Sequence, residues 1–387
     1  MLPYSIYEFY LVMAGMIVLL YGAKKFSRQI DYRWMLGLFN FSFLIFFYPK
    51  PLHFFLLVVY AWLMTYLLHK TIKPRKKIWG IFLLLLPMLL VKLDIRFGHY
   101  PFELNHLLSF AGLSYASFRM MGCYLDLAPD DAVPGQLDYF NFLSFTPTLL
   151  IGPIDKFSRF RESLKSGWQQ LNSDAFLEGW HSFLKGFSFK YLLAEIIDRY
   201  WLSMFDAGDT SLLAMTNSMY AYYVYLFFDF AGYSHMALGL GKMMGMKVPV
   251  NFTNPFVARN PQEFWRSFHI SLGDWLKDYF FSPLYLYFSR KKKLKAYPLL
   301  RQNLSLFLTF LLMGCWNGFS KNFILSGALF GLYSAVHNTY TVQCKKQGRD
   351  LIFSGLSETS IKLISIFILF NLVAFALYIF SGRFPLF

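Results

Sequence analysis

Chemistry in this sequence would depend on a few ionisable side chains that stand within apolar runs. Asp229 lies in the run YLFFDFAGYS, and His269 lies in the segment FWRSFHISLGDWLKDYFFSPLYLYF, which covers residues 264–288. A charged side chain at the centre of a membrane helix costs about 2.5–3.5 kcal/mol or more, so each must face a partner or water. Carboxylates and imidazoles are also groups that transfer protons in enzymes.

Asp229 has two interpretations. As a buried acid it would accept hydrogen bonds from hydroxyls near it in the sequence, such as those of Tyr225, Tyr233 or Ser234, and would fix the packing of its helix. As a functional group it would line a substrate path through the membrane. The sequence leaves both interpretations open.

The segment around His269 has the pattern of an amphipathic helix. Trp265, His269, Leu272 and Leu276 recur at helical spacing, whereas charged residues occupy another side. A lone histidine on an aromatic and apolar face is commonly a structural hydrogen-bonding group, and catalysis is the alternative. Both roles remain open for His269 at this point.

A third candidate is the sequence MGCWNG at 313–318, which ends an apolar run. Its two glycines flank Trp316 and Asn317, and they allow another backbone or a ligand to come close. An asparagine amide donates and accepts hydrogen bonds but takes up no proton at neutral pH. Asn317 alone therefore favours binding over acid–base catalysis.

Membrane helices must position these residues. Of 387 residues, 56% are hydrophobic and 21% aromatic, and only 15% are charged, against about 25% in soluble proteins. This composition excludes a disordered protein and predicts a multi-pass membrane protein. The net charge of +15 fits loops beside anionic lipid better than a nucleic-acid partner, which we do not expect. The three cysteines are far apart and predict neither a disulfide framework nor a metal site.

Ten apolar runs approach the roughly 20 residues that cross the hydrocarbon of a bilayer. They cover residues 7–22, 34–49, 52–68, 78–93, 104–125, 180–197, 211–233, 303–318, 322–341 and 360–381. Because Lys and Arg collect on the cytoplasmic side, ten spans place both termini outside the cell. The basic runs then lie inside, at 24–33, 70–77, 290–295 and 345–349.

Two further apolar segments, 139–153 and 264–288, do not fit this count. A full crossing by either would move the later basic loops to the wrong side. We expect both to be re-entrant or interfacial helices on the cytoplasmic side, and 124–138 and 154–176 to be cytosolic loops. No internal repeat or long linker is visible, so residues 1–387 are expected to form a single domain.

Several motifs, in their order along the chain, resemble those of the membrane-bound O-acyltransferase (MBOAT) family. They are Gly152–Asp155 with Arg159–Phe160, Tyr225–Ser234, Asn251–Phe252, Asn254–Phe256, Phe264–Arg266, His269–Leu272, Asp278–Tyr279, the SRKK run from Ser289, and Phe380–Gly382. The resemblance covers nearly the whole chain. Within the family it is strongest to the bacterial DltB branch, which transfers D-alanine in teichoic acid biosynthesis.

The resemblance implies an all-α fold with a ring of about ten to twelve transmembrane helices, and re-entrant or interfacial helices around a central tunnel. It implies no cofactor bound by the chain itself, because the acyl donor is the phosphopantetheine arm of a D-alanyl carrier protein (DltC-like). The other implied partners are DltD-like and DltX-like membrane proteins, the lipid bilayer and, downstream, teichoic acid. The implied location is the bacterial cell membrane.

One motif departs from the family pattern. The family's nearly invariant active-site histidine stands in a Trp-His-Gly motif, which reads Trp316-Asn317-Gly318 here. A second family histidine is retained as His269, whereas a further one is replaced by Ser334. Attack of a hydroxyl on a thioester needs a proton acceptor and a donor to the oxyanion, and an amide supplies only the second. The resemblance thus implies that His269 and Asn317 are the catalytic candidates, and that the substrate or tunnel candidates are Asp229, Trp265 and Trp316.

The basic run is a candidate docking site for an acidic carrier protein, and a lipid-facing loop is the alternative. Its residues are Arg290, Lys291, Lys292 and Lys293. Two other functions compete with acyl transfer for the whole chain. A catalytically inactive MBOAT scaffold would bind the carrier or a lipid-linked polymer, and a transporter would use the tunnel and the intramembrane acid for a solute. The lack of an internal repeat disfavours the transporter.

Overall fold

The computed structural model describes residues 7–26, 30–48, 50–71, 77–97, 112–205, 209–349 and 352–385. Within these ranges the chain is helical, and its one β-type pairing is an antiparallel bridge between Phe252 and Phe268. The all-α fold class is therefore confirmed. The chain divides into two compact units, which are described separately: unit 1 comprises Met1–Gly186 and Tyr233–Pro249, and unit 2 comprises Phe187–Gly232 and Val250–Phe387. The single domain over 1–387 stays a prediction.

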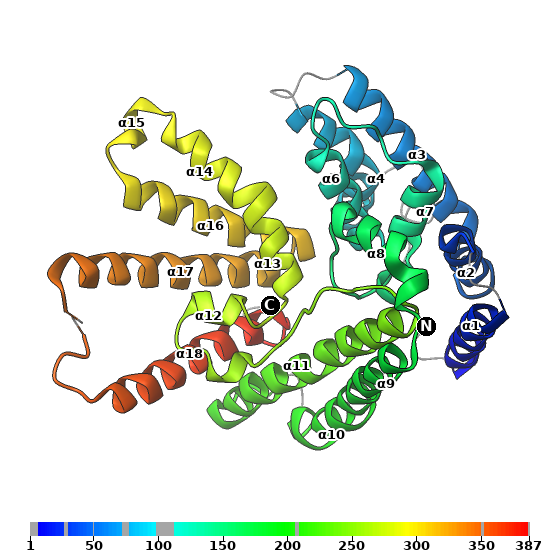
Figure 1. The fold of residues 1–387 in the computed structure, drawn as a ribbon. Helices are drawn as coiled ribbons and strands as arrows, with labels where there is room; N and C mark the ends of the chain where they lie inside the picture. The colour runs from blue at the N-terminus through cyan, green and yellow to red at the C-terminus, as the bar shows by residue number, and fades with distance from the viewer. Residues whose placement is uncertain are drawn as a thin grey trace. The chain divides into compact units, whose positions relative to one another are not determined.

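The helices of unit 1 carry blue to green colours in Figure 1. They are α1 (Tyr7–Phe26), α2 (Tyr32–Phe47), α3 (Pro51–Thr71), α4 (Lys77–Phe97), α6 (Leu113–Asp126), α7 (Gln136–Ser144), the 3₁₀ turn η3 (Thr146–Thr148), α8 (Phe157–Gln170) and most of α9 (Ser173–Ser188). The last turns of α11 (Leu212–Met243) also belong to this unit.

Unit 2 contains the rest of α11 and the segments that follow α9. These are the π-helical turns η4 (Phe189–Ala194), η5 (Asp198–Leu202) and η7 (Lys277–Phe281), the 3₁₀ turn η6 (Pro255–Val257), α10 (Glu195–Ile197), α12 (Pro261–Trp265), α13 (Ile270–Leu276), α14 (Ser282–Ser289), α15 (Lys292–Lys295), α16 (Pro298–Asn317), α17 (Lys321–Gln347) and α18 (Glu358–Phe380).

Four of the described helices are long and apolar enough to cross a membrane: α1, α3, α16 and α18. Shorter apolar helices cover Tyr32–Phe47 and Trp79–Lys92. Each predicted span overlaps a helix, although residues 104–111 of the fifth lie outside the described residues. The number of crossings, the ring with its tunnel and the sides of the termini stay predictions.

One prediction about loops is wrong, because α8 occupies most of the supposed cytosolic loop 154–176. Its polar composition hides an amphipathic helix. Phe157, Phe160, Leu164 and Trp168 recur every three or four residues, and all four are buried. The segment 139–153 is broken as its proline suggested, with α7 ending at Ser144 and η3 starting at Thr146.

Arg119 of α6 is fully buried in unit 1 and holds this break together. Its Nη1 donates hydrogen bonds to the carbonyl oxygens of Phe142 and Leu143, at 3.1 and 3.2 Å. Its Nη2 donates to Thr148, through both the carbonyl and the hydroxyl oxygen. The guanidinium thus satisfies carbonyls that the end of α7 and the following turn leave without helical partners.

Two glycines bring α16 and α17 together in unit 2, where the helices run side by side in Figure 1. A Cβ atom on Gly314 would lie 2.4 Å from the Phe323 carbonyl oxygen, and one on Gly327 would lie 2.6 Å from that of Phe310. No larger residue fits either position without a backbone shift. The first of these glycines belongs to the MGCWNG motif, so part of that motif serves helix packing.

Candidate active site

The candidate site lies in unit 2, on the segment between α11 and α14, and α12 begins it. Asn260 caps this helix: its Oδ1 accepts a hydrogen bond from Glu263 N at 2.9 Å, and its Nδ2 donates to Glu263 Oε1 at 2.9 Å. Pro261 occupies the first helical turn, where its missing N–H costs nothing. The sequence NPQE is thus a start signal that places the helix three residues earlier than residue 264.

The segment 264–288 is helical but interrupted, because the chain turns sharply between α12 and α13. His269 has φ +52° and ψ +49°, and it is the one non-glycine residue with positive φ in the described ranges. Phe268 pairs with Phe252, and Ile270 N donates to the Asn251 carbonyl oxygen at 3.0 Å. These bonds to a distant segment replace the hydrogen bonds that would continue α12.

The backbone of His269 is held in place from both sides. Its carbonyl oxygen accepts the N–H groups of Leu272 and Gly273, each at 3.1 Å, and so begins α13. A left-handed conformation costs a residue with a Cβ atom about 1–2 kcal/mol. Such strained residues concentrate at functional sites, where the surrounding structure enforces them.

The imidazole of His269 lies against an aromatic ring and has no polar partner. The ring of Phe230 stands edge-on to it, with centroids 4.6 Å apart. His269 Nε2 is enclosed and makes no hydrogen bond, and none is found for the rest of the ring within the described residues. A structural histidine would be hydrogen-bonded at this depth. His269 thus lacks the hydrogen bond expected of a structural histidine, and catalysis by His269 stays a prediction.

Asn251 fixes the turn that carries His269, a role that its residue type alone does not indicate. The side chain is 2% exposed, and its Oδ1 accepts hydrogen bonds from Ser271 N at 3.1 Å and Ser271 Oγ at 2.8 Å. Its own carbonyl holds Ile270. Asn251 appeared in the sequence only as part of a family motif, since 18 residues separate it from His269.

Asp229 pairs with Lys190, a partner that the sequence analysis did not consider. Lys190 comes from the π-helical turn η4, and both side chains are 20% exposed. Phe189 packs beside the pair against Phe227 and Phe228 of α11. The ion pair thereby anchors the turn of α11 that also carries Phe230, the ring in contact with His269.

Trp265 lies in the aromatic core of unit 2. Its ring contacts those of Phe310 in α16 and Phe330 in α17, with centroid distances of 5.1 and 5.0 Å. The indole Nε1 is enclosed and has no hydrogen-bond partner. Two unpartnered ring nitrogens, those of Trp265 and His269, thus belong to one short segment of the chain.

Trp316 and Asn317 come from a different element than this pair. They end α16, and Asn317 lies seven residues beyond Phe310, about 10 Å along the helix. The Asn317 side chain is exposed, and its Nδ2 donates to the Met313 carbonyl oxygen at 2.9 Å within the same helix. One amide hydrogen and the Oδ1 atom therefore remain available for a ligand.

The basic run lies at the turn from α14 to α15, and all four of its side chains are exposed. Lys291 Nζ stands over the Tyr287 ring, 4.5 Å from its centroid. The run comprises Arg290, Lys291, Lys292 and Lys293. A docking surface must be exposed, as this run is. Docking of a carrier protein on it stays a prediction.

The described helices are those of a multi-pass, all-helical membrane protein with unpartnered polar groups in an aromatic core. Residues 26–379 match the model of the family described as MBOAT, membrane-bound O-acyltransferase family. The chain belongs to this family, as its motifs predicted.

Curated relatives narrow the comparison. The chain is 33% identical over 306 residues to the teichoic acid D-alanyltransferase of Bacillus subtilis, which covers 77% of this chain and 76% of that protein. It is 32% identical over 339 residues to that of Streptococcus thermophilus, covering 83% and 79%. A probable alginate O-acetylase of Pseudomonas putida is 34% identical over 258 residues, covering 65% of this chain and 50% of that protein. The family is thus varied in acyl group and acceptor, and the relatives named for D-alanyl transfer match most of this chain.

Proposed function

We propose that this chain transfers a D-alanyl group from a carrier-protein thioester toward teichoic acid, as the membrane acyltransferase of a D-alanylation system. Family membership and the two D-alanyltransferase relatives support the reaction class. The observation that carries the assignment of the site is the enclosed, unpartnered Nε2 of His269 on a strained backbone.

The chemistry is attack of an acceptor hydroxyl on the thioester carbonyl. A C–O ester bond forms as the C–S bond breaks, and the hydroxyl proton passes to the departing thiolate. His269 carries this proton, because its ring has a free nitrogen to accept it. Asn317 orients the acyl group or donates its remaining N–H to the oxyanion, and the unpartnered indole N–H of Trp265 is a second donor of the same kind.

An acidic carrier docks on the basic run at the turn from α14 to α15. Its phosphopantetheine arm is the acyl donor and is a substrate, so the chain itself holds no cofactor. DltD-like and DltX-like membrane proteins complete the system. Replacement of Lys291, Lys292 and Lys293 by Glu should weaken carrier binding strongly at low salt, because exposed charges act through screened attraction. The matched change of Lys345, Lys346 and Arg349 to Glu should leave binding unchanged. Unchanged binding in the first variant excludes this docking site.

A specific observation favours a second function, that of a scaffold without catalysis. The motif position that carries histidine in the family carries Asn317, whose amide bonds to its own helix. A scaffold of this kind keeps the carrier-docking surface and passes no acyl group. It competes directly with the first proposal, and one measurement separates the two.

The test is transfer of labelled D-alanine from the carrier protein in membranes that contain this chain. We expect transfer above that of membranes without it, and we expect His269→Ala to abolish it. His181→Ala changes an exposed histidine of α9 and should transfer normally. Transfer that survives His269→Ala removes the assignment of His269, and carrier binding without any transfer establishes the scaffold.

A further inference from the structure

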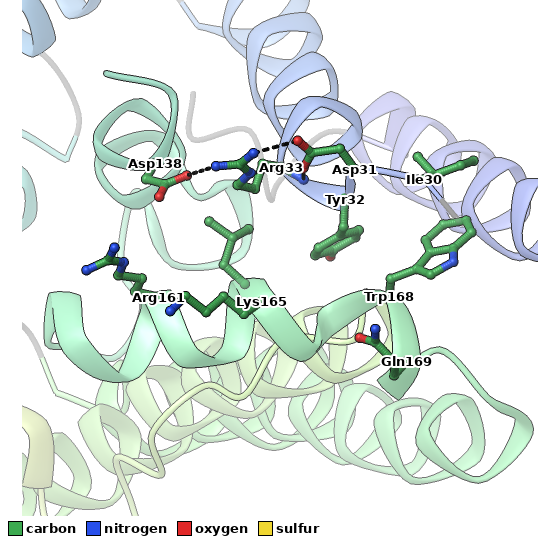
Figure 2. Close-up of a pocket in the computed structure, with 10 residues that line it drawn as sticks. Ile30, Asp31, Tyr32, Arg33, Asp138, Arg161, Lys165, Trp168 and Gln169 are labelled. Atoms are coloured by element: carbon green, nitrogen blue, oxygen red, sulfur yellow. Dashed lines mark hydrogen bonds and ion pairs between the residues drawn. The ribbon is translucent and has the colours of Figure 1, made fainter. Parts of the chain in front are cut away.

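Unit 1 contains a cavity of about 500 Å³ that plays no part in the proposed reaction. It lies between the turn before α2, the first turn of α7 and the polar face of α8, as Figure 2 shows. The residues that matter for its chemistry are Asp31, Arg33, Asp138, Arg161, Lys165 and Trp168.

Two of the three cations in this cavity have no protein partner. Arg33 is occupied, because its Nε and Nη2 bond to the two oxygens of Asp31 at 2.9 and 2.7 Å and lower the pKa of that carboxyl. Arg161 and Lys165 stand one turn apart on α8, both exposed, and form no ion pair or side-chain hydrogen bond within the described ranges. They can therefore hold one anionic group between them.

An acidic group in the same cavity lacks a donor. Asp138 Oδ1 is enclosed and accepts no hydrogen bond, since Nη1 of Arg33 is 3.9 Å away. Oδ1 offers no accessible surface to a ligand, but the Asp138 side chain is 15% exposed, so a ligand hydroxyl would donate to its other oxygen. The cavity thus suits a ligand that carries an anion and, a few bonds away, a hydroxyl.

The cavity adjoins the ends of apolar helices, which favours a lipid headgroup as its ligand. The apolar helix α2 begins at Tyr32, soon after the candidate span α1, so Ile30 and Asp31 at its start are expected at the depth of the lipid headgroups. Trp168 and Lys24 are the residue types enriched there: Lys24 Nζ lies 5.0 Å from the Trp168 ring centroid and bonds to its carbonyl oxygen at 2.7 Å.

We propose that this cavity binds a phosphodiester headgroup that carries a hydroxyl, as in phosphatidylglycerol. The phosphate lies between Arg161 and Lys165, and the headgroup hydroxyl donates to Asp138. A volume of about 500 Å³ is enough for such a headgroup. Free glycerol phosphate shares this chemistry, and the test separates the two sources.

The test uses the full-length protein in detergent, with bound lipid counted by native mass spectrometry. The probes are phosphatidylglycerol, phosphatidylethanol, which has the same charge but no hydroxyl, and sn-glycerol 3-phosphate. We expect phosphatidylglycerol to bind most tightly. The variant Arg161→Gln with Lys165→Gln should weaken its binding by about tenfold or more, because both charge-assisted bonds are lost. The control Lys345→Gln with Lys346→Gln removes the same charge elsewhere and should bind within about twofold of the unmodified protein.

A third variant tests the hydroxyl contact. Asp138→Asn should narrow the preference for phosphatidylglycerol over phosphatidylethanol, because a neutral amide accepts a weaker hydrogen bond than a carboxylate. Equal binding of these two lipids by the unmodified protein overturns the role of Asp138. Unchanged phosphatidylglycerol binding in the Arg161 and Lys165 variant, with an unchanged unfolding temperature, overturns the site. Glycerol phosphate that binds as tightly as the lipid overturns the lipid source.

Discussion

Arg119 in unit 1 and His269 in unit 2 are both enclosed polar side chains, but they differ in their partners. The Arg119 guanidinium makes several hydrogen bonds and leaves only its Nε without one. Both terminal nitrogens of Arg119 donate to carbonyls of the α7 end and the turn after it. The enclosed Nε2 of His269 has no partner, and its backbone is strained. A satisfied buried group stabilises a fold, whereas an unsatisfied one costs stability and requires another explanation.

The comparison assigns stability to one residue and chemistry to the other. The Lys190–Asp229 pair has a role of both kinds. Its charges neutralise each other, and it anchors the turn of α11 that carries Phe230, the ring beside His269.

The largest effect should come from Asn317→His. A positioned imidazole supplies about 10²- to 10⁴-fold in rate as a general base, and the family motif places one at this position. Transfer of D-alanine should rise by that factor and should increase through about pH 6 to 7, as the imidazole loses its proton. A variant that folds and binds the carrier but transfers no more than background shows that the site differs from the family's active site at more than position 317. That result favours the scaffold function.

Arg119→Leu should cause the largest loss of stability. It leaves three buried carbonyl oxygens without their donor, and each costs about 1–3 kcal/mol, so we expect a loss of about 3 kcal/mol or more. Thermal unfolding in detergent measures it, with the exposed Arg349→Leu as the matched control. If both variants unfold at the same temperature, Arg119 does not stabilise the end of α7 and the turn after it, and its structural role is excluded.

Lys190→Met should cause a loss of stability smaller than that of Arg119→Leu. Removal of one partner leaves the charge of Asp229 in an apolar setting, which costs about 3 kcal/mol for a buried pair and less for these partly exposed groups. The double change Lys190→Met with Asp229→Leu removes both charges and should recover most of the loss. A double variant less stable than the single one shows that the pair contributes more than mutual neutralisation.

The smallest change in stability should follow His269→Asn. Asparagine tolerates the left-handed conformation better than most residues, and the histidine gives up no hydrogen bond, so unfolding should shift by less than about 1 kcal/mol. Transfer should nevertheless be lost. A loss of stability as large as that of Arg119→Leu shows instead that His269 has a structural role like that of Arg119.

The sequence by itself determined the fold class, the long apolar helices and the family. Apolar runs such as those of α1, α3 and α18 contain almost no charge, so their length alone identifies them as membrane helices. The family motifs keep fixed neighbours, such as the Phe-Trp before His269, and are readable without coordinates. The amphipathic period of α8 was also present, but its low mean hydropathy hid it among the loops.

Only the tertiary structure decided what surrounds the polar side chains. The helical spacing of Trp265, His269, Leu272 and Leu276 gave no sign of the turn at His269. Bonds to Asn251 and Phe252 produce that turn, because contacts between distant segments outweigh local preference. Lys190 lies 39 residues from Asp229, and the cavity of unit 1 joins three separate elements. Residue types and spacing state which groups can bond, but whether each one has a partner depends on how distant segments pack together.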